Sequence, residues 1–259
     1  MIRKLALTVI GFTGTFLLNA QNQTNEKPLD SIQKLDEVII NSNQIFGSKY
    51  VASNRTGSAY YLSPQELRKF GFTDINRALR SVPGVTFYEE DGFGLRPNIS
   101  LRGTSPERSA KISLMEDGVL IAPAPYGASA AYYFPSVARM EAVEILKGSS
   151  QVQYGPFTSG GAINMVSTQI PDHFSGRIKA SYGSFNSGQV YASVGDSNKN
   201  FGYNVEYLNF NSDGFKNLLN DANTGFDKND VVAKFRLNTD KEAKTQQSFE
   251  TKFQFAEDR

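Results

Sequence analysis

The sequence predicts an α+β domain followed by the first strands of an antiparallel transmembrane β-barrel, and three observations support this order. Phe and Tyr are abundant (19 and 12 residues) whereas Trp and Cys are absent, a composition typical of a β-rich protein. Residues 48–171 mix short helix signals with short strand signals, whereas the chain after Pro171 alternates apolar and polar residues. The connections between the alternating segments run short, short, long and short, as in bacterial outer-membrane barrels.

The composition excludes several classes of function. Because there is no cysteine, the chain has no disulfide, thiolate metal site or cysteine nucleophile. Its 27 Lys and Arg residues nearly balance 26 Asp and Glu residues, which argues against nucleic acid as a partner. His173 is the one histidine, and we interpret it as a linker residue. A secreted enzyme would need a catalytic constellation that the sequence does not offer, so we expect no enzyme.

Residues 1–20 are predicted to be a secretory signal peptide. Arg3 and Lys4 precede an apolar run over residues 5–18, and Ala20 provides a small residue for cleavage. The alternative, a membrane anchor, would need a longer run than this. We therefore expect an exported protein.

Residues 21–44 are predicted to form a tether, and its first part, residues 21–34, is expected to be flexible because it is polar and has almost nothing to bury. Within the tether, residues 35–41 contain a short β-prone stretch. An isolated strand is not stable, so this stretch would pair with the sheet edge of another protein, or else form the first strand of the next domain.

Residues 45–171 are predicted to form the α+β domain. Ser63 and Glu66 form a capping box for a helix from Pro64 to about Lys69, and Thr73 is predicted to cap a second helix over residues 74–81. Short strands are expected at 85–88, 99–102, 112–115, 119–122, 143–146 and 162–167.

Residues 172–259 are predicted to form about five strands of a partial transmembrane β-barrel. The alternating segments are 177–182, 189–194, 201–207, 231–238 and 249–255. A soluble β-sandwich gives the same alternation and stays open as an alternative. Five strands leave unpaired edges, which lipid does not tolerate. We therefore expect a truncated barrel that does not transport by itself.

Ordered strings in the α+β domain resemble the plug domain of TonB-dependent outer-membrane receptors. The strings are Ala78-Leu79, Val82–Val85, Ser100–Gly103, Met115–Val119, Val137–Gly148, Tyr154-Gly155 and Ser159–Val166. The resemblance implies an α+β plug domain followed by the first strands of the barrel, located in the outer membrane in contact with its lipid. It also implies TonB, with its inner-membrane energising complex, as a partner. The implied TonB box consists of Asp36, Glu37, Val38, Ile39 and Ile40.

Within the family, three strings look most like the ferric citrate transporter subgroup: Arg102–Pro106, Asp117-Gly118 and Ala124–Gly127. This implies a ferric chelate, either a siderophore or a citrate-like compound, as transported ligand and no resident cofactor or metal. The ligand-facing loops would be 90–98, 104–108 and 123–128, with the ligand-binding residues Arg96, Ser105, Glu107, Arg108, Tyr126 and Ala128.

Two of these positions depart from the subgroup, because Glu107 replaces an Arg and Ala128 replaces a Gln. Cobalamin or an oligosaccharide therefore stays open as the ligand. A signalling module or a non-transporting fragment stays open as an alternative to a transport receptor.

The resemblance also implies contacts between plug and barrel. Arg102 and Lys147 match positions that face acidic residues of the barrel wall, although both could instead be solvated surface cations. The acidic run Glu89–Asp91 could bind calcium, but a solvated loop is the simpler interpretation. The glycines at 148, 155, 160 and 161 match no phosphate-loop string and predict tight turns.

Overall fold

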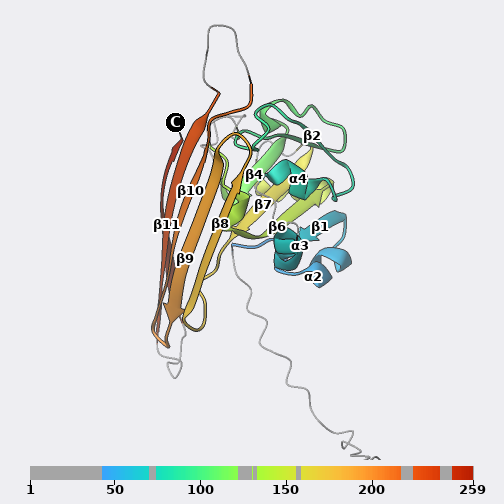
Figure 1. The fold of residues 1–259 in the computed structure, drawn as a ribbon. Coiled ribbons are helices and arrows are strands. Elements are labelled where there is room, and N and C mark those ends of the chain that lie inside the picture. Colours follow the sequence, from blue (N-terminus) through green and yellow to red (C-terminus); the bar gives the residue numbers. More distant parts are fainter. Residues whose placement is uncertain are drawn as a thin grey trace, which may run out of the picture. The chain divides into compact units, whose positions relative to one another are not determined.

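The structure, a computed structural model, describes residues 43–69, 74–121, 130, 133–155, 159–216, 224–239 and 247–258 (Figure 1). The predicted signal peptide and the TonB box stretch, Asp36–Ile40, lie outside the described residues, as do Tyr126 and Ala128. No helix in the described ranges is long and apolar enough to cross a membrane.

The described residues before Pro171 form the predicted α+β domain around a five-stranded mixed sheet of order β1-β6-β7-β4-β5. β4 and β7 run parallel, and the other neighbours are antiparallel. A separate hairpin pairs β2 with β3. The strands are β1 (Ser58–Leu62), β2 (Val85–Tyr88), β3 (Asn98–Leu101), β4 (Ile112–Glu116), β5 (Val119–Leu120), β6 (Met140–Lys147) and β7 (Gly161–Ser167).

Within its described residues, this domain also contains three short α-helices and three 3-10 helices. They are α2 (Lys49–Asn54), α3 (Pro64–Lys69), α4 (Ile75–Leu79), η1 (Glu107–Ser109), η3 (Val137–Arg139) and η4 (Ser149–Tyr154). The capping box of α3 is confirmed: the Ser63 amide donates to Glu66 Oε2 (2.8 Å) and the Glu66 amide to Ser63 Oγ (3.3 Å).

The predicted cap of the next helix was wrong by one residue. The Asp74 carboxylate, not Thr73, caps α4 by accepting from the Asn76 amide at 2.8 Å. The helix also ends at Leu79, two residues before the predicted end at Ser81. Both Thr73 and Asp74 are good N-cap types, so local sequence alone did not separate them.

The mixed sheet buries both faces. Val143, Ile145 and Ile163 pack on one face with α3, α4 and β3, whereas Leu146 and Ala162 pack on the other face with Phe46 and α2. Alternate residues of β6 and β7 therefore belong to different cores, as the period of two requires.

The described residues after Pro171 form an antiparallel five-stranded sheet of order β12-β11-β10-β9-β8, which we call the wall sheet (Figure 1). Its strands match the five alternating segments predicted from the sequence and extend beyond most of them. They are β8 (Ser175–Gly183), β9 (Ser187–Ser197), β10 (Phe201–Ser212), β11 (Phe226–Asn238) and β12 (Ser248–Asp258). The sheet is open, with β8 and β12 at its edges in the described part of the chain.

The polarity of the wall sheet is inverted relative to a soluble protein. Its mainly polar face is buried: Tyr191 and Lys234 are each 1% exposed. Its apolar face points outward, with Ile178 81% and Phe253 61% exposed. A β-sandwich would bury the apolar face, so this arrangement excludes the sandwich alternative for the described strands.

Candidate functional site

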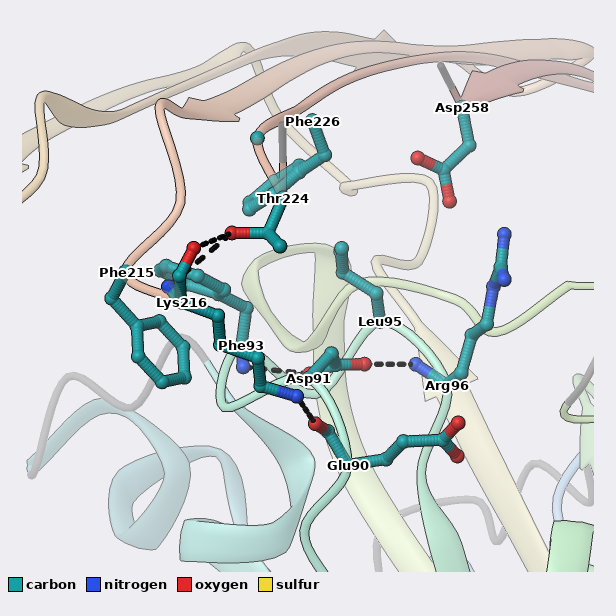
Figure 2. A pocket seen from close by; sticks show the side chains of 11 residues that line it. Glu90, Asp91, Phe93, Leu95, Arg96, Phe215, Lys216, Thr224, Phe226 and Asp258 are labelled. Carbon is teal, nitrogen blue, oxygen red and sulfur yellow. Dashed lines mark hydrogen bonds between the residues drawn. The ribbon is translucent and has the colours of Figure 1, made fainter. Parts of the chain in front are cut away.

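A cavity of about 320 Å³ lies between the β2–β3 connection and the end of the wall sheet where β10 passes to β11 (Figure 2). Three stretches of chain line it, two from these connections and one from the end of β12. The lining residues are Glu90, Asp91, Phe93, Leu95, Arg96, Phe215, Lys216, Thr224, Gly225, Phe226 and Asp258.

Aromatic rings hold the two connections together on one side of this cavity. The Phe93 ring centroid lies 4.9 Å from that of Phe226, 5.7 Å from Phe215 and 6.1 Å from Phe210. Phe210 and Phe226 also meet edge to face at 4.9 Å. Edge contacts of this kind add to the area that the rings bury, so the β2–β3 connection is anchored to the wall sheet through Phe93.

The Asp91 carboxylate organises the β2–β3 connection. Its Oδ1 accepts from the amides of Phe93 (2.7 Å) and Gly94 (2.6 Å), and its Oδ2 accepts from the amide of Arg96 (2.8 Å). A side chain at Gly94 would place its Cβ only 2.1 Å from Asp74 Oδ1, so the turn requires glycine there. Asp91 therefore shapes a loop, and no group of three or more metal-ligating side chains gathers in the described ranges.

The charged side chains of the cavity are of both signs. Lys216 Nζ donates to the backbone oxygen of Glu90 at 2.5 Å and so bridges the two connections. Figure 2 shows the Arg96 guanidinium on the same side of the cavity as Asp258. Arg96 is exposed and can therefore meet an anionic ligand from solution.

Of the predicted ligand-binding residues, Arg96 lines the cavity, and Ser105, Glu107 and Arg108 are exposed in the chain after β3. Hydrogen bonds join these two stretches. The Arg108 amide donates to Asn98 Oδ1 at 2.7 Å, and Ser109 Oγ donates to the Pro97 oxygen at 2.8 Å. The structure thus links the first two predicted ligand loops, while their role in binding stays a prediction.

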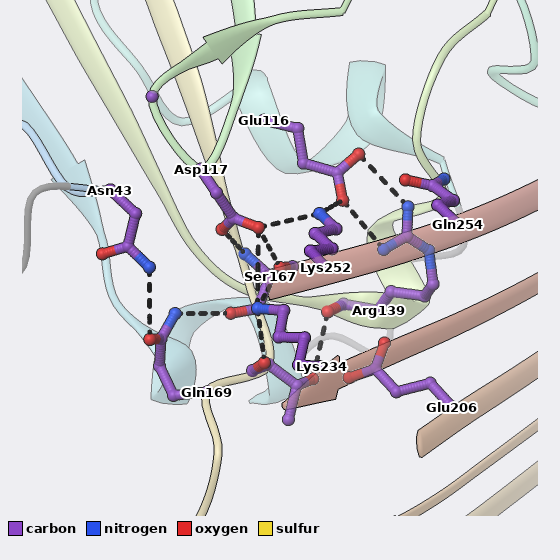
Figure 3. A network of polar contacts seen from close by, with 12 residues as sticks. Asn43, Glu116, Asp117, Arg139, Ser167, Gln169, Glu206, Lys234, Lys252 and Gln254 are labelled. Carbon is purple, nitrogen blue, oxygen red and sulfur yellow. Dashed lines mark hydrogen bonds and ion pairs between the residues drawn. The ribbon is translucent and has the colours of Figure 1, made fainter. Parts of the chain in front are cut away.

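A buried set of ion pairs joins the α+β domain to the inner face of the wall sheet (Figure 3). Arg139 of η3 is fully buried, and its Nη1 donates to Glu116 Oε1 at 2.9 Å. Its Nε donates to Asp230 Oδ2 of β11 at 2.7 Å. One guanidinium therefore bridges a carboxylate of the α+β domain and a carboxylate of the wall sheet.

Two lysines of the wall sheet complete this set. Lys252 Nζ of β12 lies 2.5 Å from Glu116 Oε1 and 2.8 Å from Asp117 Oδ2. Lys234 Nζ of β11 lies 3.5 Å from Asp117 Oδ2 and donates to Ser167 Oγ at 2.7 Å. We call Glu116, Asp117, Arg139, Asp230, Lys234 and Lys252 the charge seam; its carboxylates and cations balance.

The turn that presents Asp117 has a recognisable sequence, Asp117-Gly118. Asp117 and Gly118 both have positive φ (52° and 79°) and close the two-residue hairpin between β4 and β5. An Asp-Gly pair favours this conformation. The hairpin therefore fixes the direction in which the Asp117 carboxylate meets the wall sheet.

Three members of the seam, Glu116, Asp117 and Arg139, have pKa values shifted towards their charged forms. Burial alone would raise the pKa of Asp117, but the ammonium groups of Lys234 and Lys252 outweigh it and hold that pKa at about 2. Burial opposes ionisation of Glu116 as well, yet Arg139 and Lys252 keep its pKa below the usual value. Burial would lower the pKa of Arg139, but Glu116, Tyr133 and Asp230 hold it well above its ordinary value.

Arg102 and Lys147, the predicted plug–barrel contacts, lie close to each other. Lys147 Nζ donates to the backbone oxygen of Pro83 at 2.6 Å. Burial lowers the pKa of Lys147, and the charge of Arg102 lowers it further. Their acidic partners in a barrel wall stay a prediction.

The charge seam was not predicted from the sequence. Glu116 and Arg139 lie within the strings that carry the family resemblance, and Lys234 and Lys252 lie on the polar side of their alternating segments. The charged residues on the polar face of the predicted strands were the sequence feature that could have indicated a contact with the α+β domain. Their pairing across 91 residues, from Arg139 to Asp230, has no local pattern.

The fold and the charge seam define a class of protein. In this class a domain with its own apolar cores packs against the polar face of a sheet whose other face is apolar and exposed. Residues 52–162 match the family model described as the TonB-dependent Receptor Plug Domain. The resemblance of this part of the chain to a TonB-dependent receptor plug domain, stated from the sequence, is therefore confirmed.

Solved structures share the fold of the plug domain and the wall sheet together. The ferric citrate transporter FecA in its unliganded form is 20% identical, with a TM-score of 0.68 over 85% of this chain and 34% of that one. The ferric yersiniabactin uptake receptor FyuA of Yersinia pestis is 23% identical, with a TM-score of 0.62 over 79% and 32%. The pyoverdine outer membrane receptor FpvA of Pseudomonas aeruginosa PAO1 is 20% identical, with a TM-score of 0.56 over 76% and 27%. The chain thus spans about a third or less of these relatives, and the likeness shows the fold.

Replacing Arg139 by Met should destabilise the contact between plug domain and wall sheet. The change leaves Glu116 and Asp230 buried without their shared cation, and breaking a buried pair in this way costs about 3–5 kcal/mol. Urea unfolding in detergent micelles, followed by circular dichroism, measures the loss. The control Arg80→Met breaks the exposed pair with Glu89 and should cost less than about 1 kcal/mol. Equal losses in both variants would contradict this assignment.

Acid should weaken the seam only below about pH 4. Because the pKa of Asp117 is about 2 when folded and 3.8 ordinarily, its contribution of about 2 kcal/mol is complete above pH 4 and is lost as pH falls towards 2. The free energy of unfolding, measured from pH 7 to 2, should therefore fall less steeply in Asp117→Asn than in the unmodified chain. In the exposed control Asp172→Asn it should fall as steeply as in the unmodified chain. An acid limb that is unchanged by Asp117→Asn would refute the role of this carboxylate.

Proposed function

We propose that this chain contributes the plug domain and wall strands of a TonB-dependent outer-membrane receptor that takes up a ferric chelate. The single observation that carries the proposal is the inverted wall sheet. Its polar face packs on the plug domain through buried charges, while its apolar face is exposed. An apolar face of five strands in water would be a large exposed patch, whereas lipid removes that cost.

The plug domain suits the polar interior of a barrel. Its own cores are apolar and internal, and it meets the wall sheet through ion pairs and hydroxyls. A wide barrel encloses a lumen that needs such a stopper. Outer-membrane lipid is the proposed environment of residues 172–259, with residues 45–171 as the plug domain.

The proposed cargo is a ferric chelate that binds without being chemically changed. The printed functions of the similar structures, a ferric citrate transporter and a ferric yersiniabactin uptake receptor, support this class. Arg96 and Lys216 at the cavity, with Ser105 and Arg108 on the adjoining loop, supply cations and donors for the oxygens of such a chelate.

The N-terminal segments fit the same proposal. Residues 1–20 would direct export, and residues 21–44 would tether the TonB box. Energised TonB would pair with Asp36–Ile40 as an added strand and pull, since main-chain pairing needs only a short extended segment. The product would thus be a receptor held in the outer membrane and driven from the inner one.

Cargo class is tested by binding to outer membranes that contain this chain, with radiolabelled iron as citrate, yersiniabactin and pyoverdine complexes. One complex should bind, and Arg96→Ala should weaken it about tenfold, the effect of one charge-assisted hydrogen bond. The control Arg80→Ala, on the exposed pair with Glu89, should leave binding unchanged. Binding of cobalamin or an oligosaccharide in place of all three complexes would contradict the proposal.

The TonB box is tested with the periplasmic domain of TonB. Val38→Pro removes a backbone donor and should abolish capture of this chain, because strand addition depends on main-chain hydrogen bonds. Val38→Thr keeps the donor and the β-propensity and should be captured as well as the unmodified chain. Full capture of the proline variant would show that this stretch is not the contact.

A further inference from the structure

A buried carboxylate in the middle of the plug domain holds the chain segment that follows the predicted tether. Glu144 lies at the centre of β6 and is 0% exposed. It belongs to the sheet face that also carries Leu146 and Ala162, which are apolar. A carboxylate buried among apolar side chains is costly unless it is fully hydrogen-bonded.

Three consecutive backbone amides satisfy this carboxylate. The amide of Ile45 donates to Glu144 Oε2 at 2.6 Å. The amides of Phe46 and Gly47 donate to Oε1 at 2.7 and 2.8 Å. Hydrogen bonds to a charged acceptor are short and about twice as strong as neutral ones.

Asn164, directly opposite Glu144 on β7, completes the arrangement. Its Nδ2 donates to Glu144 Oε2 at 2.8 Å and to the backbone oxygen of Asn43 at 3.0 Å. Its Oδ1 accepts from the Gly118 amide at 2.8 Å. One buried amide therefore contacts both the segment 43–47 and the turn that carries Asp117.

A second line of hydrogen bonds runs from the same segment to the same turn (Figure 3). Asn43 Nδ2 donates to Gln169 Oε1 at 3.3 Å, and Gln169 Nε2 donates to the Ser167 oxygen at 2.9 Å. The Ser167 amide donates to Asp117 Oδ1 at 2.9 Å. Asp117 in turn meets the wall lysines of the charge seam.

We propose that Glu144 and Asn164 form an internal clip for residues 43–47, which opens when the tether is pulled and loosens the Asp117–Gly118 turn of the charge seam. This inference rests on the proposed function, since it assigns the pull to TonB. It adds a structural step: among the described residues, those of the clip are the ones that force along the chain from the tether would reach first.

The geometry makes opening of the clip a concerted event. Three amides share one carboxylate, and Phe46 is buried beside Leu146 and Met115. Partial release would leave the carboxylate shielded from water and short of hydrogen bonds. That state is higher in free energy than either the closed or the fully open clip. The segment therefore leaves together, water reaches Glu144, and the Asn164 amide loses its partner at Asn43.

The test is hydrogen exchange of the whole chain in detergent, with Glu144→Gln against the control Glu141→Gln on the same strand. Glutamine keeps the shape of Glu144 but loses the charge and places an amide against the backbone donors. Exchange at residues 45–47 and at Gly118 should accelerate at least about tenfold in Glu144→Gln, as loss of charged hydrogen bonds predicts. It should not change in Glu141→Gln or in β10 and β11.

Unchanged protection of residues 45–47 in Glu144→Gln would overturn the clip, and acceleration there without any at Gly118 would overturn its coupling to the seam. Should Glu144→Gln fail to fold, Asn164→Ala replaces it for residues 45–47 alone, because this variant also removes the acceptor of the Gly118 amide. In addition, the chain has no native cysteine, so Ile45→Cys gives a single thiol whose maleimide labelling reports opening. Pulling the tether from residue 35 should speed that labelling about tenfold, on the same hydrogen-bond energies, and an unchanged rate would refute release by force. None of these readouts uses a chelate or TonB, so their failure is distinguishable from failure of the uptake proposal.

Discussion

The structure depends on a balanced set of charges buried between two surfaces that are both polar where they meet. Arg139 joins Glu116 of the plug domain to Asp230 of the wall sheet, and Lys234 and Lys252 reach back to Asp117. Because the wall sheet directs its polar residues at this seam, its apolar residues must point outward. One constraint therefore sets the position of the plug domain and the environment of the wall sheet together.

A charged contact would suit the proposed role of the plug domain, which must stay in place and still be moved when TonB pulls. Buried ion pairs fix one geometry, because an unpaired buried charge costs much free energy. Their net stabilisation relative to the same charges in water is modest. An apolar contact of the same area would bind the plug domain without such selectivity. Asp117 connects the charge seam to the N-terminal segment: its carboxylate faces the wall lysines, and its turn contacts Asn164 beside residues 43–47.

Much of the fold was predictable because its signals are local. The five wall strands repeat every two residues over long segments, and Asp117-Gly118 and Ser63–Glu66 carry their turn and cap in the sequence. β1 and α2 are short and were not predicted, and Thr73 was chosen over Asp74 because both are good caps. The seam and the Glu144 contacts were not predicted for a different reason. They depend on residues far apart in the chain, such as Arg139 and Asp230, 91 positions apart, or Ile45 and Glu144, 99 positions apart, and no local pattern encodes such pairs.

If the face of the wall sheet opposite the plug domain is in contact with lipid, the side chains of β10 should meet lipid and protein alternately. Single cysteines at positions 203 to 208, in a chain without native cysteine, can each carry a fluorophore in membranes that contain nitroxide-labelled lipid. Lipid contact predicts strong quenching at Tyr203, Val205 and Tyr207. Quenching should be weak at Asn204, Glu206 and Leu208, so that it alternates along the strand. Uniform quenching along the strand, or quenching confined to the even positions, would contradict lipid contact at this face.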